Sequence, residues 1–530
     1  MDLDRGHVSR ERDRPLKPST PMRPNLFSRL ASADFAVRSN VIASFASNFT
    51  TAVLTLVSVP LYIGYVGVEA YALVGLFISM QAIFAVLDLG LSAAITRELA
   101  GEDRPHAEKR DLLRTAEAIY WGTAAVAAAI GLALAPYLAV YVKSSSIPYE
   151  TLLENFHLIA LCLGLQFPVG MYSASLLGMH RQVLLGVVNI VFAIVRVGGT
   201  LLALEFVSAA PQTIFAWHAV SSGLQIVVLA AAAWASMPDT VSRAGVKFAT
   251  AARLWRFTAG VTGITVMSVL LTQVDKIVLA RILPLESFGY YAIAGVVANS
   301  LGRFIQPVFQ VYFPRFTQLS SRGERKLLVE AYHQGSQLIS VLVLPVAAVF
   351  VFFPREVLML WQGDPAIVAN SNVVLALLTA GSAVNALLFM PYALQLAHGW
   401  TRLHFVALTT GVLLSVPATV LLVTRFGGEG AAWVWIAFNA AFLALVVPAA
   451  HRRILPGESG RWYLSDVLLP AAAVTVAALV GRSIFPETAD RTLLFVQLGV
   501  VFAAALAAAC LAAEHIRRPL LKKLTRRASL

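Results

Sequence analysis

Residues 491–514 read RTLLFVQLGVVFAAALAAACLAAE, with no charged residue between the first and last positions. A helix rises about 1.5 Å per residue, so about 20 such residues cross the ~30 Å hydrocarbon core of a bilayer. Similar stretches lie upstream at 38–60, 71–95, 115–142, 152–176, 184–205, 211–236, 258–282, 288–314, 329–353, 371–396, 403–424, 430–450 and 464–485. We therefore predict an all-α polytopic membrane protein with about 14 transmembrane helices.

The composition of the whole chain agrees with a lipid environment. Of its 530 residues, 58% are hydrophobic and 13% are charged, and the mean hydropathy is +0.73. Soluble domains carry roughly 25% charged residues. The loops between the apolar stretches are short, so no soluble catalytic domain fits between them. Cys162 and Cys510 both lie in apolar stretches, which excludes a disulfide framework.

Basic residues are distributed unequally between the two sides of the predicted membrane. Of the 41 Lys and Arg residues, 32 lie in the termini or in the loops after even-numbered spans. Six lie in the loops after odd-numbered spans, and three lie inside spans. Cytoplasmic loops are enriched in Lys and Arg, so we predict that both termini are cytoplasmic. The net charge of +12 then indicates orientation and attraction to anionic lipids, not nucleic-acid binding.

Two similar hairpin segments indicate an internal duplication. VGVEAYA at 66–72 joins spans one and two, and LPLESFG at 283–289 joins spans seven and eight. Parallel repeats place a substrate site at the interface of the two halves. We predict pseudo-symmetric six-helix bundles at 38–236 and 258–450, joined by a basic cytoplasmic linker at 237–257 and followed by two further helices within 464–514. The tails at 1–37 and 515–530 are predicted to be disordered, basic and cytoplasmic.

Polar residues recur at helical spacing within several spans. In span eight, steps of four, three and four place Asn299, Arg303, Gln306 and Gln310 on one face. Ser and Thr residues form comparable stripes in spans one and seven, with Asn48 beside the first. Such stripes are either helix-packing seams or the wall of a hydrated cavity. Pro307 follows Arg303 by one turn and predicts a kink there.

Charged residues inside the spans are predominantly cationic. The spans contain three basic residues, Arg196, Lys276 and Arg303, and two acidic residues, Asp88 and Asp275. This cationic surplus suits an anionic ligand such as a phosphate. Asp275 is either a coupling-ion or proton site or the charge partner of a neighbouring basic residue. We expect Lys276 to be a poor partner, since adjacent residues point apart on a helix. Asp88 is interpreted as a structural anchor near the inner interface.

Motifs for nucleotide, metal or covalent chemistry are absent from the sequence. There is no GxxxxGK[ST] phosphate loop, no HExxH and no GxSxG. The histidines show no metal-ligand spacing. We therefore predict no enzymatic activity, no catalytic residues, no metal and no cofactor.

Three segments resemble a known family. Residues 71–100, YALVGLFISMQAIFAVLDLGLSAAITRELA, are similar to the second span of polysaccharide-export, Wzx-type O-antigen flippases of the multidrug/oligosaccharidyl-lipid/polysaccharide (MOP) exporter superfamily. Residues 273–319 resemble their seventh and eighth spans, and FGGEGAAW at 426–433 resembles a later hairpin. The resemblance implies two V-shaped bundles, a cavity lined by spans one, two, seven and eight, alternating access, and an isoprenoid-diphosphate-linked saccharide as substrate.

Together these observations predict a bacterial inner-membrane flippase that moves an isoprenoid-diphosphate-linked oligosaccharide from the cytoplasmic to the outer leaflet. The diphosphate is expected to be attracted by Arg303, Lys276 and Arg196. Sugar hydroxyls are expected to bond to Asn299, Gln306, Gln310 and Asn48. Expected partners are the lipid-linked saccharide, anionic lipids, and polysaccharide polymerase or export proteins. The alternatives are a drug or small-cation exporter of the same superfamily, or a membrane-embedded glycan-processing enzyme.

Overall fold

The computed structural model describes residues 26–101, 105–144, 146–237, 244–258, 262–486, 488 and 490–518. Helices make up nearly all of this part of the chain, and its sole β-bridge joins Lys143 to Pro284. The first half comprises α1 (Leu26–Phe84), a 3-10 turn η1 (Ala85–Asp88), α2 (Leu91–Ala100), α3 (His106–Tyr141), α4 (Tyr149–Gly178), α5 (Gln182–Phe206), α6 (Pro211–Ala235) and α7 (Phe248–Thr258).

The second half begins with α8 (Thr262–Ile282), α9 (Leu285–Asn299), α10 (Gly302–Ser321), α11 (Arg325–Phe352), α12 (Pro354–Trp361), α13 (Pro365–Leu387) and α14 (Phe389–Ala397). It continues with α15 (Arg402–Ala441), a π turn η2 (Phe442–Val446), α16 (Val447–Ile454), α17 (Ser459–Arg461) and a second π turn η3 (Trp462–Leu468). The last helices are α18 (Leu469–Ile484) and α19 (Arg491–Ala512).

The number of membrane-spanning segments agrees with the sequence. Within the described residues, 12 helical stretches are long and apolar enough to cross a membrane. Two of them, Ala46–Asp88 and Arg402–Ile454, are far longer than one crossing. Each is broken by a glycine with positive φ, at Gly67 (φ 78°) and Gly427 (φ 59°), a conformation that glycine adopts without steric cost. Dividing the two stretches there gives fourteen spans, and the chain is a multi-pass all-α membrane protein.

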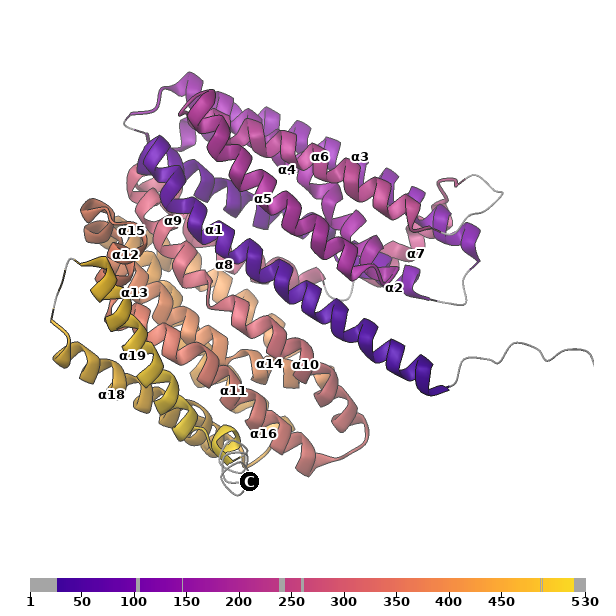
Figure 1. The fold of residues 1–530 in the computed structure, drawn as a ribbon. Helices are drawn as coiled ribbons and strands as arrows, with labels where there is room; N and C mark the ends of the chain where they lie inside the picture. Colours follow the sequence, from indigo (N-terminus) through magenta and orange to yellow (C-terminus); the bar gives the residue numbers. More distant parts are fainter. Residues whose placement is uncertain are drawn as a thin grey trace, which may run out of the picture.

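Small residues allow the helices of each half to pack closely. A Cβ built on Gly131 of α3 would lie 2.8 Å from Ala160 Cβ of α4, and one on Gly164 would lie 2.9 Å from Ala128 Cβ. Such close approach replaces the hydrophobic effect as the source of packing energy in lipid. α1 runs between the two halves, while α18 and α19 lie on the outside of the second half beside α11 (Figure 1).

Three segments outside the predicted spans contain helix. α1 begins at Leu26, so residues 26–37 are helical and not part of a disordered tail; residues 1–25 lie outside the described residues. The long apolar-flanked loop at 354–370 contains α12. The linker contains α7, whose Leu254 is buried against the first half. Lys247, just before α7, bonds Asp111 at 2.5 Å, and that carboxylate raises the pKa of the lysine.

A buried polar cluster attaches the last two spans to the second half. The Nδ1 atom of His333 in α11 lies 2.5 Å from Oδ2 of Asp466 in η3, and both side chains are fully buried. Gln337 Nε2 donates to Asp466 Oδ1 at 2.8 Å, and its Oε1 accepts from the backbone N–H of His515 at 2.7 Å. His333 Nε2 also lies 3.0 Å from Glu458 Oε2. Because every member has a partner, the cluster positions α18 and the end of α19 against α11.

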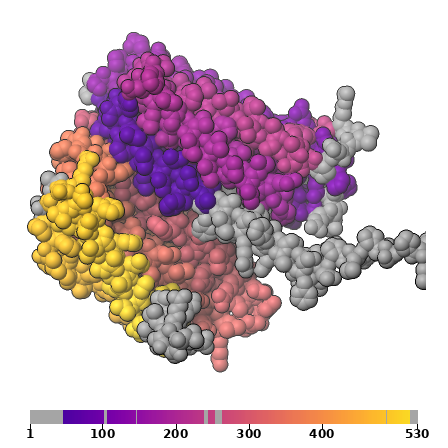
Figure 2. Space-filling view, viewed as in Figure 1, coloured from indigo at the N-terminus to yellow at the C-terminus, as the bar shows by residue number. Residues whose placement is uncertain are grey.

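The two halves meet at the side that carries the hairpins after odd-numbered spans, here called the hairpin side. The backbone N–H of Leu285 donates to the Lys143 carbonyl at 2.7 Å, and Trp361 Nε1 donates to the Leu56 carbonyl at 2.8 Å. α1 and α9 also pack closely: a Cβ on Gly75 would lie 2.7 Å from Ala292 Cβ. In Figure 2 the two halves are in contact along the left part of the view.

Candidate functional site

Two adjoining cavities lie where the halves meet. The first, here called the C-bundle pocket, has a volume of about 260 Å³ and lies between α8, α9, α13, α15 and the second arm of α1. The second, here called the midline pocket, measures about 190 Å³ and lies between both arms of α1, α8, α9 and the start of α10. Both are lined by Ile78, Ser79, Lys276, Tyr291, Gly295 and Asn299. These shared residues make the two pockets one bipartite site.

The spans around this site agree with the expectation from the family resemblance. Spans one, two, seven and eight correspond to the arms of α1, to α8, and to α9 with α10, and all four line the midline pocket. The C-bundle pocket adds α13 and α15, which belong to spans ten, eleven and twelve. The polar stripe of span one contributes Thr55, and span two contributes Ser79. The cavity therefore extends further into the second half than the polar stripes indicated.

Asp275 forms an ion pair with Lys276, contrary to the sequence-based expectation. Lys276 Nζ lies 3.0 Å from both carboxylate oxygens and also donates to the Thr272 carbonyl at 2.6 Å. The flexible four-carbon stem folds back by one turn, which brings the ammonium past its sequence neighbour. Tyr291 of α9 donates its hydroxyl hydrogen to Asp275 Oδ2. Asp275 is thus paired with Lys276 in this structure, and the expectation that Lys276 is a poor partner was wrong.

Arg303 lines the midline pocket without a protein partner. Its side chain is exposed, and among the described residues it has neither a hydrogen bond nor an ion pair. The expected kink is present, because span eight is interrupted between Asn299 and Gly302, one turn before Pro307. The N–H groups of Arg303 and Phe304 bond three residues back, to Ser300 and Leu301. These two backbone N–H groups are thus already bonded, so what the site offers an anion is the guanidinium itself.

The other polar residues of span eight divide between the site and its approach. Asn299 lines both pockets, and its amide has no hydrogen bond among the described residues. Gln306 and Gln310 are exposed on α10 but line neither pocket. Asn48 is exposed on α1, one turn before Ala52 of the midline pocket, and also lies outside it. These three extend the polar surface away from the hairpin side.

Arg196 lies apart from the site. Its Nη2 donates to Gln225 Oε1 of α6 at 2.9 Å, and Gln225 Nε2 donates to Asn189 Oδ1 at 3.3 Å. This network is inside the first bundle, so the structure does not bring Arg196 together with Lys276 and Arg303. Arg196 therefore bonds a neighbouring helix, and a basic residue inside a span does not by itself indicate a cavity.

Asp88 has the structural role that the sequence indicated. It ends the 3-10 turn before α2, where Ser92 Oγ donates to Oδ1 at 2.7 Å and the Ser92 N–H lies 3.3 Å from Oδ2. Tyr120 of α3 donates to the same carboxylate. The side chain therefore satisfies the first turn of α2 and holds it to α3.

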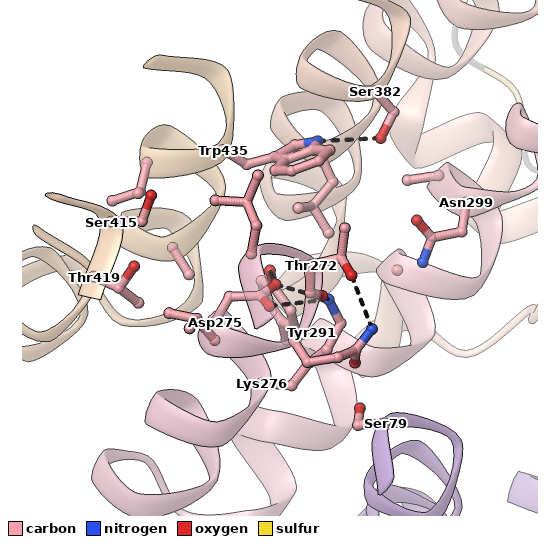
Figure 3. A pocket seen from close by; sticks show the side chains of 18 of the residues that line it. Ser79, Thr272, Asp275, Lys276, Tyr291, Asn299, Ser382, Ser415, Thr419 and Trp435 are labelled. Atoms are coloured by element: carbon pink, nitrogen blue, oxygen red, sulfur yellow. Dashed lines mark hydrogen bonds and ion pairs between the residues drawn. The ribbon is translucent and has the colours of Figure 1, made fainter. Parts of the chain in front are cut away.

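The sequence reasoning missed the residues contributed by α13 and α15. Ser382, Ser415, Thr419 and Trp435 line the C-bundle pocket, and Figure 3 shows Trp435 and Ser382 across the cavity from Asp275, Lys276 and Tyr291. Ser415 and Thr419 stand four residues apart, a short stripe that the sequence already contains. Trp435 carries no such signal, because its position depends on packing between α13 and α15.

A family and one curated protein match the sequence. The family described as "Polysaccharide biosynthesis protein" matches residues 37–320. A Shigella flexneri protein named "Putative O-antigen transporter" is 23% identical over 395 residues, which cover 73% of this chain and 92% of that protein.

Solved structures match the fold over most of the chain. The lipid II flippase MurJ in an inward closed conformation aligns with a TM-score of 0.70 at 14% identity, covering 91% of this chain and 99% of that one. An inward-facing multidrug resistance MATE family transporter of the MOP superfamily aligns with a TM-score of 0.60 at 13% identity, covering 76% and 96%. At these sequence identities, the similarity to the two structures shows a shared fold only.

Proposed function

The chain belongs to the polysaccharide biosynthesis protein family, and on that premise we propose that it is a flippase for an isoprenoid-diphosphate-linked oligosaccharide. It moves this lipid from the cytoplasmic to the outer leaflet of the bacterial inner membrane. The relative named as an O-antigen transporter and the fold shared with a lipid II flippase support this substrate class. In this proposal the protein is a transporter and makes or breaks no covalent bond in its substrate.

The observation that carries the proposal is the unpartnered guanidinium of Arg303 in the midline pocket. An arginine within the membrane is costly and normally pairs with an acid or a carbonyl. Among the described residues Arg303 does neither, whereas the carboxylate that lines the C-bundle pocket, Asp275, is already bound by Lys276 and Tyr291. A diphosphate supplies the missing anion, and the planar guanidinium suits bidentate binding of phosphate oxygens. Lys276 lines both pockets too, but its ammonium is paired with Asp275, so Arg303 is the cation proposed to bind the diphosphate.

Alternating access follows from the way the halves are joined. The hairpin side is closed by backbone contacts and by close packing of α1 on α9. Buried apolar side chains of both halves form one cluster at this side, whereas each half also has an apolar cluster of its own. In this proposal the halves separate at the shared cluster while the other two stay intact. In this proposal the hairpin side faces the outer leaflet and both termini face the cytoplasm, as the distribution of Lys and Arg indicates. Anionic lipids and polysaccharide polymerase or export proteins are the proposed partners.

A drug or small-cation exporter is the competing function, because the fold is shared with MATE transporters. A cation needs a free carboxylate in the cavity. Asp275 lines the C-bundle pocket, but its oxygens are occupied by an ammonium and a phenol. The charge of the site therefore favours the anionic substrate.

The test is deletion of the gene followed by mapping of the lipid-linked glycan with a membrane-impermeant lectin on intact spheroplasts. Complete units should accumulate on the cytoplasmic face, and the wild-type chain should restore outward delivery. Arg303→Ala should fail to restore it although the protein inserts. Arg315→Ala is the matched control, because this arginine is exposed on the same helix and lines neither pocket. Normal delivery in the deletion strain, with altered drug sensitivity, would favour the exporter.

A further inference from the structure

We propose that the C-bundle pocket is a saccharide subsite in which the indole ring of Trp435 stacks against a sugar of the substrate. This inference rests on the proposed function and assigns the two pockets different parts of one ligand. The diphosphate lies in the midline pocket beside Arg303, and the first sugar lies in the C-bundle pocket.

The ring of Trp435 is held rigidly at the pocket wall. Its Nε1 donates to Ser382 Oγ at 3.3 Å, and its ring lies 6.2 Å from that of Phe438 in a stacked arrangement. A Cβ on Gly381 would lie 2.4 Å from Trp435 Cδ1, so the indole fits against α13 only because that residue is glycine. An aromatic side chain fixed in this way offers a large contact area at little entropic cost.

Neutral polar groups line the same pocket. Thr419 and Asn299 both line the pocket and make no side-chain hydrogen bond among the described residues. Ser415 Oγ donates to the Gly411 carbonyl at 2.6 Å, which leaves its oxygen free to accept. Sugars combine apolar C–H faces with hydroxyl groups that both donate and accept, so an aromatic plane with a rim of hydroxyls and an amide complements them.

The charged residues of the C-bundle pocket also suit an uncharged ligand. Asp275 and Lys276 neutralise one another at 3.0 Å, with side chains 19% and 24% exposed. Tyr291 binds the same carboxylate, so no free ion of either sign remains at this wall. Figure 3 shows this group on the opposite side of the cavity from Trp435. A neutral ring between the two walls meets an aromatic face on one side and hydrogen-bonding groups on the other.

The two pockets adjoin in the order that the substrate requires. Asn299 and Lys276 line both of them, and Arg303 follows Asn299 by one helical turn. A diphosphate on Arg303 therefore places its attached sugar next to Asn299, at the entrance to the C-bundle pocket. The prenyl chain leaves in the other direction, toward lipid.

The experiment compares two soluble probes on the full chain in nanodiscs: farnesyl diphosphate, and farnesyl diphosphate bearing one sugar, with glucose, galactose and N-acetylglucosamine tested in turn. The wild type should bind at least one glycosylated probe more tightly than farnesyl diphosphate. Trp435→Leu should weaken binding of that probe about five- to tenfold, which is the scale of one lost aromatic contact. It should leave binding of farnesyl diphosphate unchanged.

Matched variants separate stacking from folding. Trp433→Leu is the control, because this tryptophan stands two residues away, is 52% exposed and does not line the C-bundle pocket. Trp435→Phe keeps a ring and should retain most of the affinity. Thr419→Val preserves shape, so it keeps the subsite testable if Trp435→Leu fails to fold; it should weaken binding of the glycosylated probe alone.

The outcomes distinguish this subsite from the proposed function. If Trp435→Leu and Thr419→Val weaken binding of both probes equally, or of neither, the saccharide subsite is wrong while the flippase proposal stands. A wild type that binds no glycosylated probe more tightly than farnesyl diphosphate also overturns the subsite. If the wild type binds none of the probes, the flippase proposal fails together with it.

Discussion

The backbone N–H of Leu285 donates to the carbonyl oxygen of Lys143 at 2.7 Å, which joins a hairpin of one half to a hairpin of the other. The two residues are far apart in the sequence, and buried apolar side chains of both halves form one cluster that includes Val142 and Leu285. Lys143 Nζ also donates to the Ile282 carbonyl at 3.3 Å. Closure of the hairpin side therefore combines hydrogen bonds between the two halves with apolar packing that both halves share.

Gly289→Leu should open the hairpin side. A Cβ on Gly289 would lie 2.7 Å from the Val68 carbonyl oxygen and 2.8 Å from Val68 Cγ1, so a larger side chain forces α9 away from α1. In a cysteine-free background, Thr55→Cys in the midline pocket should react faster with an impermeant maleimide added outside. Gly64→Ala is the control, since its Cβ meets open space. Equal labelling of all three proteins would contradict this role.

Lys276→Met should destabilise the protein by about 1–3 kcal/mol, because it leaves the largely buried carboxylate of Asp275 without its cation. The double variant Asp275→Asn, Lys276→Met should recover most of the loss, since both charges are then removed. Thermal melting of the four proteins in detergent gives the coupling between the two side chains. If the stability losses of the two single variants add up in the double variant, the coupling is zero and the ion pair makes no net contribution to stability.

His333→Leu should cost about 3–5 kcal/mol and release the last two spans from α11. Asp466 is fully buried, and without His333 it keeps only Gln337 as a side-chain partner. Limited proteolysis at the loop before α19 should become faster, and the melting temperature should fall. His398→Leu provides the comparison, because the ring of His398 is exposed and bonds one backbone carbonyl at 2.9 Å. Similar behaviour of the two variants would argue against the cluster.

Pro307→Ala should reduce transport on the order of tenfold while the protein remains folded, since small misplacement of a binding group costs this much or more. Alanine restores an N–H that can bond the Arg303 carbonyl, so the first turns of α10 straighten around Arg303 and the guanidinium turns away from the midline pocket. Export of lipid-linked glycan in the complemented deletion strain measures the effect. Pro314→Ala, in the same helix but farther from the kink, should transport normally; an equal loss there would point to general destabilisation.

Much of the site could be predicted because membrane burial makes polar residues conspicuous. Arg303, Asn299 and Lys276 stood out as polar groups at helical spacing, and all three line the cavity. The resemblance to polysaccharide-export flippases is confirmed by the family match and by the shared fold. Arg196 was predicted together with them as a cation of the site, but it lies inside the first bundle instead. Helical spacing of polar residues identifies a polar face of a span, but it does not show whether that face contacts another helix or a cavity.

The sequence by itself determined the fold class, the number of spans and the predicted orientation, because these depend on local properties: the length of apolar stretches and the position of charges beside them. Only the tertiary structure decided that Lys276 folds back onto Asp275, and that Trp435 reaches the pocket through the space left by Gly381. Both relationships depend on side-chain direction and on contacts between helices distant in sequence, which no local pattern specifies. That is why the cationic pocket could be predicted from the sequence and the aromatic pocket beside it could not.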